Sequence, residues 1–262
     1  MPRIAKSAFG TWAEYYRSYQ AALARDFLIP FMEEYGVRLS GRRVLDVGCG
    51  NGGCTAAFAE RADSCLGIDI EDFHWTAGPN LEFEKADILD PAVARRLAGT
   101  FDVVVLRDVI EHIGDKRRLL EHVKGTARGE GHALVTFPPY YSPFGAHQQA
   151  ELKGSALRHA PYMHRHPRLR HIAATRMTVG GFEALARSAG LRTRARRLYL
   201  SRPSFELRYG LPTVAFPFPG AAGLREVLCT GACYLLDVAA PVCAGPPWPD
   251  DRPTAARGPE TA

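Results

Sequence analysis

VLDVGCGNGG, residues 44–53, is the stretch that decides the fold. A short apolar run followed by a turn rich in glycine predicts a strand, a tight turn and a helix. Glycine lets a backbone approach a ligand closely, and the N-terminus of the helix presents free N–H groups to it. Gly48, Gly50 and Gly53 also satisfy G-x-G-x-x-G, the dinucleotide fingerprint, with Asp69 ~20 residues further on for a ribose hydroxyl. The stretch therefore predicts a ligand site without identifying the ligand.

Alternating segments follow the glycine turn toward the C-terminus. Nearly every residue of FDVVVL at 101–106 is apolar, as in a strand that is buried on both faces. Apolar strands that alternate with helices form parallel sheets covered by helices on both sides. The sequence therefore predicts a doubly wound α/β fold. We expect strands at 43–47, 64–69, 81–85, 101–106 and 132–137, and helices near 52–62, 91–98 and 108–124.

The alternation stops after residue 138. Residues 139–177 carry loop residues with many arginines and histidines, which indicates an insertion and not a further strand–helix unit. A helix from residue 179 that ends at Gly190, and a strand up to residue 200, resume the pattern. The C-terminal part then predicts a proline-rich connector at 203–220, a short helix near 222–228 and a strand at 230–239.

Before the glycine turn, residues 9–35 predict helical structure. Four aromatic residues lie at helical spacing and form one face. Pro30 is expected to break or kink this segment into two helices. The aromatic face predicts either a lid over a ligand or a helix packed on the edge of the sheet. Its members are Trp12, Tyr15, Tyr16 and Tyr19.

The composition excludes several classes of protein. Apolar residues make up 46% of the 262 residues and charged residues 23%, which excludes wholesale disorder. No apolar run approaches the ~18 residues that a transmembrane helix needs, and the N-terminus lacks the apolar stretch of a secretory signal. The six cysteines show no disulfide-framework spacing. We therefore expect a cytoplasmic protein with reduced thiols and no membrane association.

Positive charge is concentrated in one part of the chain. Residues 151–202 hold twelve Lys and Arg against two acidic residues, whereas the rest of the chain holds 21 against 26. Such a block can attract an anionic partner, or it can simply be a solvated surface, and both interpretations stay open. It contains no recognisable nucleic-acid-binding motif, so we expect no nucleic-acid partner.

Asp46 separates the possible ligands of the glycine turn. It ends the first strand, two residues before Gly48, and we expect its carboxylate to face the turn. A dinucleotide would place its pyrophosphate there, where the two negative charges would repel each other. A ligand with an ammonium and a sulfonium would be attracted instead. Asp46 therefore favours S-adenosylmethionine over a nicotinamide dinucleotide.

With Asp46, Gly48 and Gly50 in these places, VLDVGCGNGG resembles the first motif of the class I S-adenosylmethionine-dependent methyltransferases. GIDI at 67–70 matches the family at the end of the second strand. The resemblance implies that Asp69 binds the ribose hydroxyls and that Ile70 packs on the adenine. It also implies S-adenosylmethionine as the cofactor and a sheet of seven strands, mostly parallel, with the last strand antiparallel.

Two further segments resemble this family in order and spacing. KADILD at 85–90 places Asp87 and Ile88 where the family contacts the edge of the adenine. FDVVVLRDVIEHI at 101–113 resembles the fourth-strand motif, with Arg107 near the methionine end of the cofactor. From this resemblance, together with the pattern of segments, we expect a helical lid over 1–40, a Rossmann-like core over 41–138 and 178–240, and an inserted acceptor-side cap over 139–177. The six prolines of 241–262 predict a disordered tail.

The acceptor side is less defined. His147 follows the fifth strand, where loops face the ligand crevice, and a neutral imidazole there is our candidate general base for an acceptor hydroxyl. We also expect Tyr16, Tyr140, Tyr141 and Arg165 to contact the acceptor. The arginines of the 139–177 insertion predict that the acceptor is a small molecule that is anionic or is carried on an acidic protein.

Other residues are interpreted without a catalytic role. Asp108, Glu111 and His112 are expected to cap and pack a helix start. His159, His164, His166 and His171 lie among arginines, whose charge opposes a cation, so we predict no metal site.

The sequence favours O-methylation of a small molecule, with N- or C-methylation as alternatives. A NAD-dependent oxidoreductase and a non-catalytic cofactor-binding partner are the rival classes. The chain has no Tyr-x-x-x-Lys pair, which argues against the short-chain type of oxidoreductase. The sequence does not indicate an oligomeric state.

Overall fold

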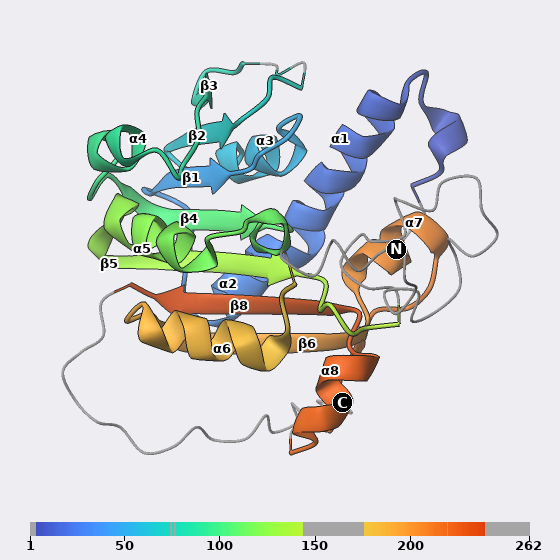
Figure 1. Cartoon of the computed structure of the whole chain (residues 1–262). Coiled ribbons are helices and arrows are strands. Elements are labelled where there is room, and N and C mark those ends of the chain that lie inside the picture. Colours follow the sequence, from blue (N-terminus) through green and yellow to red (C-terminus); the bar gives the residue numbers. More distant parts are fainter. Residues whose placement is uncertain (1–3, 74, 76, 144–175, 219, 239–262) are drawn as a thin grey trace, which may run out of the picture.

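The computed structural model describes residues 4–73, 75, 77–143, 176–218 and 220–238. Within these residues the chain forms one sheet of eight strands in the order β3-β2-β1-β4-β5-β8-β6-β7 (Figure 1). The strands are β1 (Arg43–Val47), β2 (Ser64–Asp69), β3 (Leu81–Lys85), β4 (Phe101–Arg107), β5 (Ala127–Phe137), β6 (Arg192–Ser201), β7 (Val214–Ala215) and β8 (Gly231–Asp237).

Strands β3, β2, β1, β4 and β5 are parallel to one another, which confirms the predicted doubly wound sheet. Strand β8 is inserted between β5 and β6 and is antiparallel to both, as expected for the last strand of the predicted fold. The structure has one strand more than the seven predicted. The extra strand, β7, contains two exposed residues that pair with the end of β6, too short a segment to leave a pattern in the sequence.

Helices cover both faces of the sheet. On one face, the N-terminal helices and α3 enclose a core that includes Val103 and Val105. On the other, α4, α5 and α6 enclose a core that includes Val104 and Leu106 (Figure 1). Residues 103–106 of β4 thus alternate between two cores and are all fully buried, which explains why this part of the strand is entirely apolar. The helices are α1 (Trp12–Leu23), α2 (Ile29–Glu34), α3 (Gly53–Ala59), α4 (Pro91–Arg96), α5 (Lys116–Thr126), α6 (Val179–Ser188), α7 (Pro203–Tyr209) and α8 (Ala222–Leu228).

The N-terminal helices form one continuous segment. A π-helical turn, Ala24–Leu28, joins α1 to α2, and Pro30 lies in the first turn of α2. The predicted break at Pro30 is therefore replaced by a π turn just before it, and such turns frequently occur at functional sites. Tyr15 and Tyr19 are each 4% exposed, whereas Trp12 is 51% exposed, so only part of the aromatic face packs against the protein.

Two further predictions are corrected by the structure. The segment predicted as a helix over 108–124 begins with a turn, and α5 starts only at Lys116, where the side chain of Asp115 accepts a hydrogen bond from the N–H of Arg118. Asp108 and its neighbours therefore lie before the helix, and only Asp115 caps it. The connector predicted at 203–220 contains α7, which begins at Pro203 and is followed by Gly210 as its C-cap. Both residues are ordinary start and stop signals for a helix.

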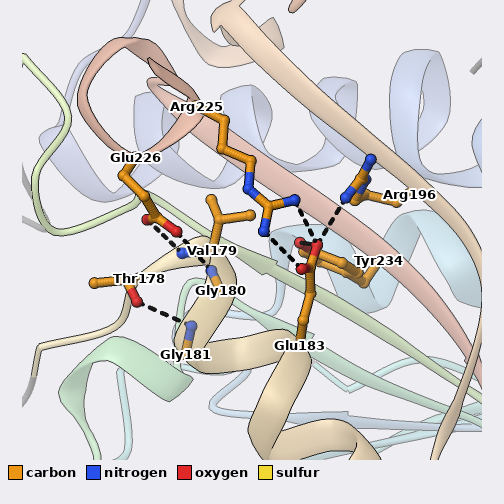
Figure 2. A network of polar contacts seen from close by, with 9 residues as sticks. All are labelled: Thr178, Val179, Gly180, Gly181, Glu183, Arg196, Arg225, Glu226 and Tyr234. Atoms are coloured by element: carbon orange, nitrogen blue, oxygen red, sulfur yellow. Dashed lines mark hydrogen bonds and ion pairs between the residues drawn. The ribbon is translucent and has the colours of Figure 1, made fainter. Parts of the chain in front are cut away.

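A buried ionic cluster ties α6 and α8 to the sheet (Figure 2). Glu183 of α6 accepts hydrogen bonds from Arg196 of β6 at 2.8 Å, from Arg225 of α8 at 2.8 Å and from the Tyr234 hydroxyl of β8 at 3.0 Å. Burial alone would raise the pKa of Glu183, but the hydrogen bond from Arg196 and the charge of Arg225 lower it below its usual value. The carboxylate is therefore the common partner of two largely buried cations.

Replacing Glu183 with glutamine should lower the free energy of unfolding by about 3 kcal/mol, because two largely buried guanidinium groups then lose the carboxylate that they share. Urea unfolding at pH 7 measures the change. In the wild type, this part of the stability should be lost as the pH falls through the lowered pKa of Glu183. The matched control is Glu121→Gln, because Glu121 forms an exposed pair with Arg117 and should contribute less than about 0.5 kcal/mol. Equal effects of the two substitutions would contradict the role of the cluster.

Candidate functional site

The glycine turn lies where β1, β2 and β4 end, on the side of the sheet to which their arrowheads point in Figure 1. The N–H of Gly50 donates to the Asp69 carboxylate at 2.8 Å, which fastens the turn to the end of β2. Gly48 has φ +70°, and a Cβ there would lie 2.5 Å from Cγ2 of Val109. Gly50 has φ +56° with open space beside it. The turn is thus packed tightly beneath Gly48 and is open beside Gly50.

Asp46 lies buried beneath the turn and is only 2% exposed. Its carboxylate accepts a hydrogen bond from the Thr55 hydroxyl of α3 at 2.5 Å. Burial raises the pKa of Asp46 to about 6, although the hydrogen bond from Thr55 and the charge of Arg107 oppose the rise. At neutral pH the carboxylate is therefore mostly ionised, and it acts on a ligand through its field more than by direct contact.

Two further oxygen acceptors belong to residues at the glycine turn. Within the described part of the chain, Oε1 of Gln20 and Oδ1 of Asn51 are buried and have no hydrogen-bond partner. Asn51 is part of the turn itself, and Cβ of Gln20 packs against Gly53. A ligand that brings N–H donors and positive charge would satisfy these oxygens, whereas a pyrophosphate carries only acceptors. The residues around the turn therefore fit the amino-acid end of S-adenosylmethionine.

The residues expected around the adenosine differ in how far their side chains are exposed. Ile70 is 63% exposed just beyond the end of β2, beside Asp69. Asp87 accepts a hydrogen bond from the N–H of Leu89 at 2.8 Å. Ile88 is 5% exposed and its side chain belongs to the core, so only its backbone can meet a ligand. Asp69 and Ile70 are thus available to a ligand as side chains.

Trp75 also lies against the glycine turn, and we did not anticipate it from the sequence. Its ring is placed so that a Cβ on Gly52 would lie 2.1 Å from it and one on Gly67 2.9 Å. It stacks on Phe83 with the ring centroids 5.2 Å apart. Its Nε1 is buried and has no acceptor among the described residues. An aromatic residue in the irregular connection after the second strand was the available signal.

Arg107 and Asp108 join the cofactor side to a neighbouring recess. The Arg107 guanidinium contacts the Asp108 carboxylate at 3.1 Å, and the Thr136 hydroxyl of β5 donates to the same carboxylate at 3.0 Å. Asp108 has φ +55°, the one positive φ outside glycine among the described residues. Such strain is retained where the surrounding structure enforces it, often at a functional site. Asp108 is therefore held in one orientation between the two sites.

The recess lies beyond Asp108, beneath the N-terminal helices. It measures about 440 Å³ out to its open mouth. Apolar side chains of the N-terminal helices, of which Phe27 is the largest, form one wall, and Asp108 and Thr136 form part of another. Arg202, between β6 and α7, and Ser204, in the first turn of α7, line a third wall. Neither had been singled out from the sequence, because the segment SRPS reads as a plain turn.

Tyr19 lies between the cofactor side and the recess. Burial raises its pKa to about 12, and the charges of Arg107, Arg202 and Asp108 all act on it. Tyr16 stands next to Tyr19 on α1, with the ring centroids 5.8 Å apart. The aromatic face of α1 is thus adjacent to both sites, and its closure over a cofactor stays a prediction.

The predicted insertion is rooted at the end of β5. The N–H of Tyr140 donates to the carbonyl of Met177 at 2.8 Å, and Arg176 donates to the Tyr141 hydroxyl at 2.7 Å. The two ends of the segment thus lie side by side next to β5, whose Thr136 lines the recess. Tyr140 is 6% exposed, and neither tyrosine lines the recess. Outside the described residues lie His147, Arg165, His159, His164, His166, His171 and the predicted tail.

The described ranges contain no group of three or more His, Cys, Asp or Glu side chains that could hold a metal ion. None of their helices combines the length and apolar character needed to cross a bilayer.

Comparison with known proteins identifies the family. Residues 14–195 match the model of a family described as methyltransferase domain, which covers more than half of the chain. Ubiquinone biosynthesis O-methyltransferase of Acinetobacter baumannii (strain AYE) is 28% identical over 115 residues, which are 40% of this chain and 48% of that protein. The chain thus matches about half the length of such curated relatives.

Solved structures show the same fold at low identity. A putative sarcosine dimethylglycine methyltransferase from Galdieria sulphuraria has a TM-score of 0.56 at 14% identity, over 82% of this chain and 85% of the other. Burkholderia thailandensis 1,6-didemethyltoxoflavin-N1-methyltransferase, solved with bound 1,6-didemethyltoxoflavin and S-adenosylhomocysteine, has a TM-score of 0.50 at 13% identity, over 87% of this chain and 81% of the other. The chain belongs to the methyltransferase domain family and, with it, to the class I S-adenosylmethionine-dependent methyltransferases.

Proposed function

We propose that this protein transfers the methyl group of S-adenosylmethionine to a small molecule held in the recess, with a hydroxyl oxygen as the favoured acceptor. The observation that carries the proposal is the position of Asp108. It contacts Arg107, whose charge acts on the buried Asp46 beneath the glycine turn, and it also lines the recess. A donor bound at the turn and an acceptor bound in the recess would therefore meet at Asp108.

The chain's own residues bind and orient the two reactants. Bound S-adenosylmethionine supplies a methyl group on a positively charged sulfur. The acceptor oxygens of Gln20 and Asn51, with the charge of Asp46, favour its amino-acid end, and Asp69 is available for its ribose. Methyl transfer to a neutral or anionic oxygen disperses charge, so alignment and exclusion of water contribute most of the acceleration.

An acceptor hydroxyl must also lose its proton. His147 is the base that we propose, as inferred from the sequence, because it follows the strand whose Thr136 lines the recess. Tyr16, Tyr140, Tyr141 and Arg165 stay proposed acceptor contacts. An oxygen acceptor is supported by the name of the matched Acinetobacter relative, whereas the Burkholderia protein is named for a nitrogen acceptor. N- or C-methylation, and an acceptor on a carrier protein, are the alternatives.

Calorimetry with two matched glycine variants tests the cofactor site. Gly50 and Gly99 both have positive φ and open space around them. An alanine at either position should therefore destabilise the fold to a similar extent, by about 1–2 kcal/mol. Gly99 hydrogen-bonds to Gly125 before β4 begins, at the opposite end of that strand from the glycine turn. Only Gly50→Ala should therefore weaken S-adenosylmethionine binding, by roughly tenfold or more.

The wild type should bind S-adenosylmethionine and S-adenosylhomocysteine, and NAD should give no measurable heat. Tight binding of NAD without binding of the sulfonium compound would overturn the proposed function in favour of an oxidoreductase. Methyl transfer from labelled S-adenosylmethionine to any small acceptor separates an enzyme from a non-catalytic cofactor-binding partner.

A further inference from the structure

Two polar groups in the wall of the recess lack partners. Nε of Arg202 and the hydroxyl of Ser204 are buried, and neither has a hydrogen-bond partner among the residues that the structure describes. Ser204 is 9% exposed, and both residues line the recess. A buried donor left unsatisfied is costly and seldom retained without reason. The two donors therefore point to a ligand that supplies acceptor atoms.

The backbone holds Arg202 firmly in this position. Its N–H donates to the Thr230 hydroxyl at 3.1 Å, and its guanidinium lies 5.0 Å from the ring centroid of Phe205. A Cβ on Gly231 would lie 2.9 Å from Cβ of Arg202, so the glycine in β8 makes room for this side chain. The guanidinium is thus a preorganised positive charge at the edge of an apolar recess.

The opposite end of the recess carries negative charge. Asp108 follows β4, whereas Arg202 follows β6, and β5 and β8 lie between these two strands. Three strand spacings separate the two backbones by about 14 Å, and the two side chains shorten the free distance. Asp108 offsets the charge of Arg107, its ion-pair partner at 3.1 Å, so an anion is attracted more toward Arg202 than toward the end of the recess next to the cofactor site.

We propose that the acceptor is a compact apolar acid, such as an aryl carboxylic acid, and that Arg202 and Ser204 bind its carboxylate. The methyl group is then transferred to the end of the acceptor that is remote from the carboxylate. The proposal rests on the proposed function, because it places the acceptor in the recess. The planar guanidinium matches a carboxylate better than a neutral amide, and the apolar wall around Phe27 suits the body of such an acid. Arg202 and Ser204 are thus specificity-determining residues.

Binding of matched acids and amides tests this inference. The probes are 4-hydroxybenzoate, 4-hydroxyphenylacetate and 4-hydroxycinnamate, each with its primary amide, titrated into the full-length protein with and without saturating S-adenosylhomocysteine. At least one acid should bind the wild type roughly tenfold or more tightly than its amide. Arg202→Gln should remove that preference and leave the affinity for the amide and for S-adenosylhomocysteine unchanged. Arg202→Lys should keep part of the preference for the acid, and Ser204→Ala should weaken the binding of the acid and not that of the amide.

The matched control is Arg187→Gln, which removes the same charge from an exposed position of α6 and should change neither affinity. The inference is overturned if acids and amides bind equally, if Arg202→Gln keeps the acid preference, or if no acid of the panel binds. Because the titrations are also made without S-adenosylhomocysteine, the comparison of acid with amide decides this inference even if the cofactor assignment fails.

Discussion

Replacing Asp46 with asparagine should raise the free energy of unfolding at pH 8 by about 3 kcal/mol and, in the same protein, weaken the binding of S-adenosylmethionine. The pKa of this carboxyl rises from 3.8 to about 6 on folding, chiefly because the group is buried. A difference of about two pKa units corresponds to about 3 kcal/mol between the two protonation states. Asparagine removes the buried charge and keeps an oxygen for the hydrogen bond from Thr55.

The sign of the pH dependence follows from the direction of that shift. Because the folded protein binds the proton more tightly than the unfolded chain, the contribution of Asp46 to stability is greatest below pH 3.8 and is lost as the pH rises through about 6. The stabilisation in Asp46→Asn should therefore be full at pH 8 and small at pH 4. Urea unfolding at these two pH values measures it.

Affinity for the cofactor should change in the opposite direction. An ionised Asp46 attracts the ammonium and the sulfonium, so the affinity of the wild type for S-adenosylmethionine should fall as the pH falls through about 6. Loss of the charge in Asp46→Asn should weaken binding roughly tenfold at pH 8 and remove this pH dependence. Calorimetric titration gives both quantities.

The matched control is Asp102→Asn. Asp102 lies at the start of β4, away from the glycine turn, where its carboxylate accepts hydrogen bonds from Arg43 and Arg128. This variant should lose stability and keep its affinity for the cofactor. If Asp46→Asn is destabilised at pH 8, or binds S-adenosylmethionine as tightly as the wild type, the electrostatic argument for the ligand is wrong.

The sheet could be predicted because each strand, and the alternation of strands with helices, follows from a pattern of neighbouring residues. β1, β2 and β3 have the predicted bounds. The apolar residues of β1 and β2 are followed by glycine or polar residues, whereas β3 alternates apolar and charged residues. The segment 108–124 misled the prediction because its apolar residues have helical spacing, although Gly114 and Asp115 mark the true start of α5. Helix α7 was missed because the prolines of the connector were taken as breakers when Pro203 opens a helix.

Residues of the site were predictable only where a local motif carries them. Asp46, Gly48, Gly50 and Asp69 belong to one turn and the strand beside it, and the structure brings them together. The recess depends instead on β8 entering between β5 and β6, which places the segment after β6 near Asp108. The sequence SRPS at 201–204 contains no local pattern that would predict this proximity. The recess could not be predicted because it depends on the order of strands that are far apart in the sequence, and not on the types of residue in any one segment.

Replacing His147 with alanine should lower kcat by roughly a hundredfold or more, because the acceptor hydroxyl then loses its general base. The binding of S-adenosylmethionine should stay unchanged. In the wild type, kcat should fall as acid protonates this base, since a protonated histidine cannot accept the proton. This pH dependence should be absent in His147→Ala. Steady-state rates on an acid accepted by the wild type measure both effects.

Two variants separate this role from its alternatives. His159→Ala removes another histidine of the same predicted insertion and should leave kcat unchanged. Asp108→Asn keeps an oxygen for Thr136 and a residue that tolerates positive φ, so it tests whether the carboxylate facing the recess is the base instead. A kcat within threefold of the wild type in His147→Ala, together with a hundredfold loss in Asp108→Asn, would assign the proton to Asp108. Because Asp108 is already fixed by Arg107 and Thr136, we expect it to orient the acceptor and His147 to take its proton.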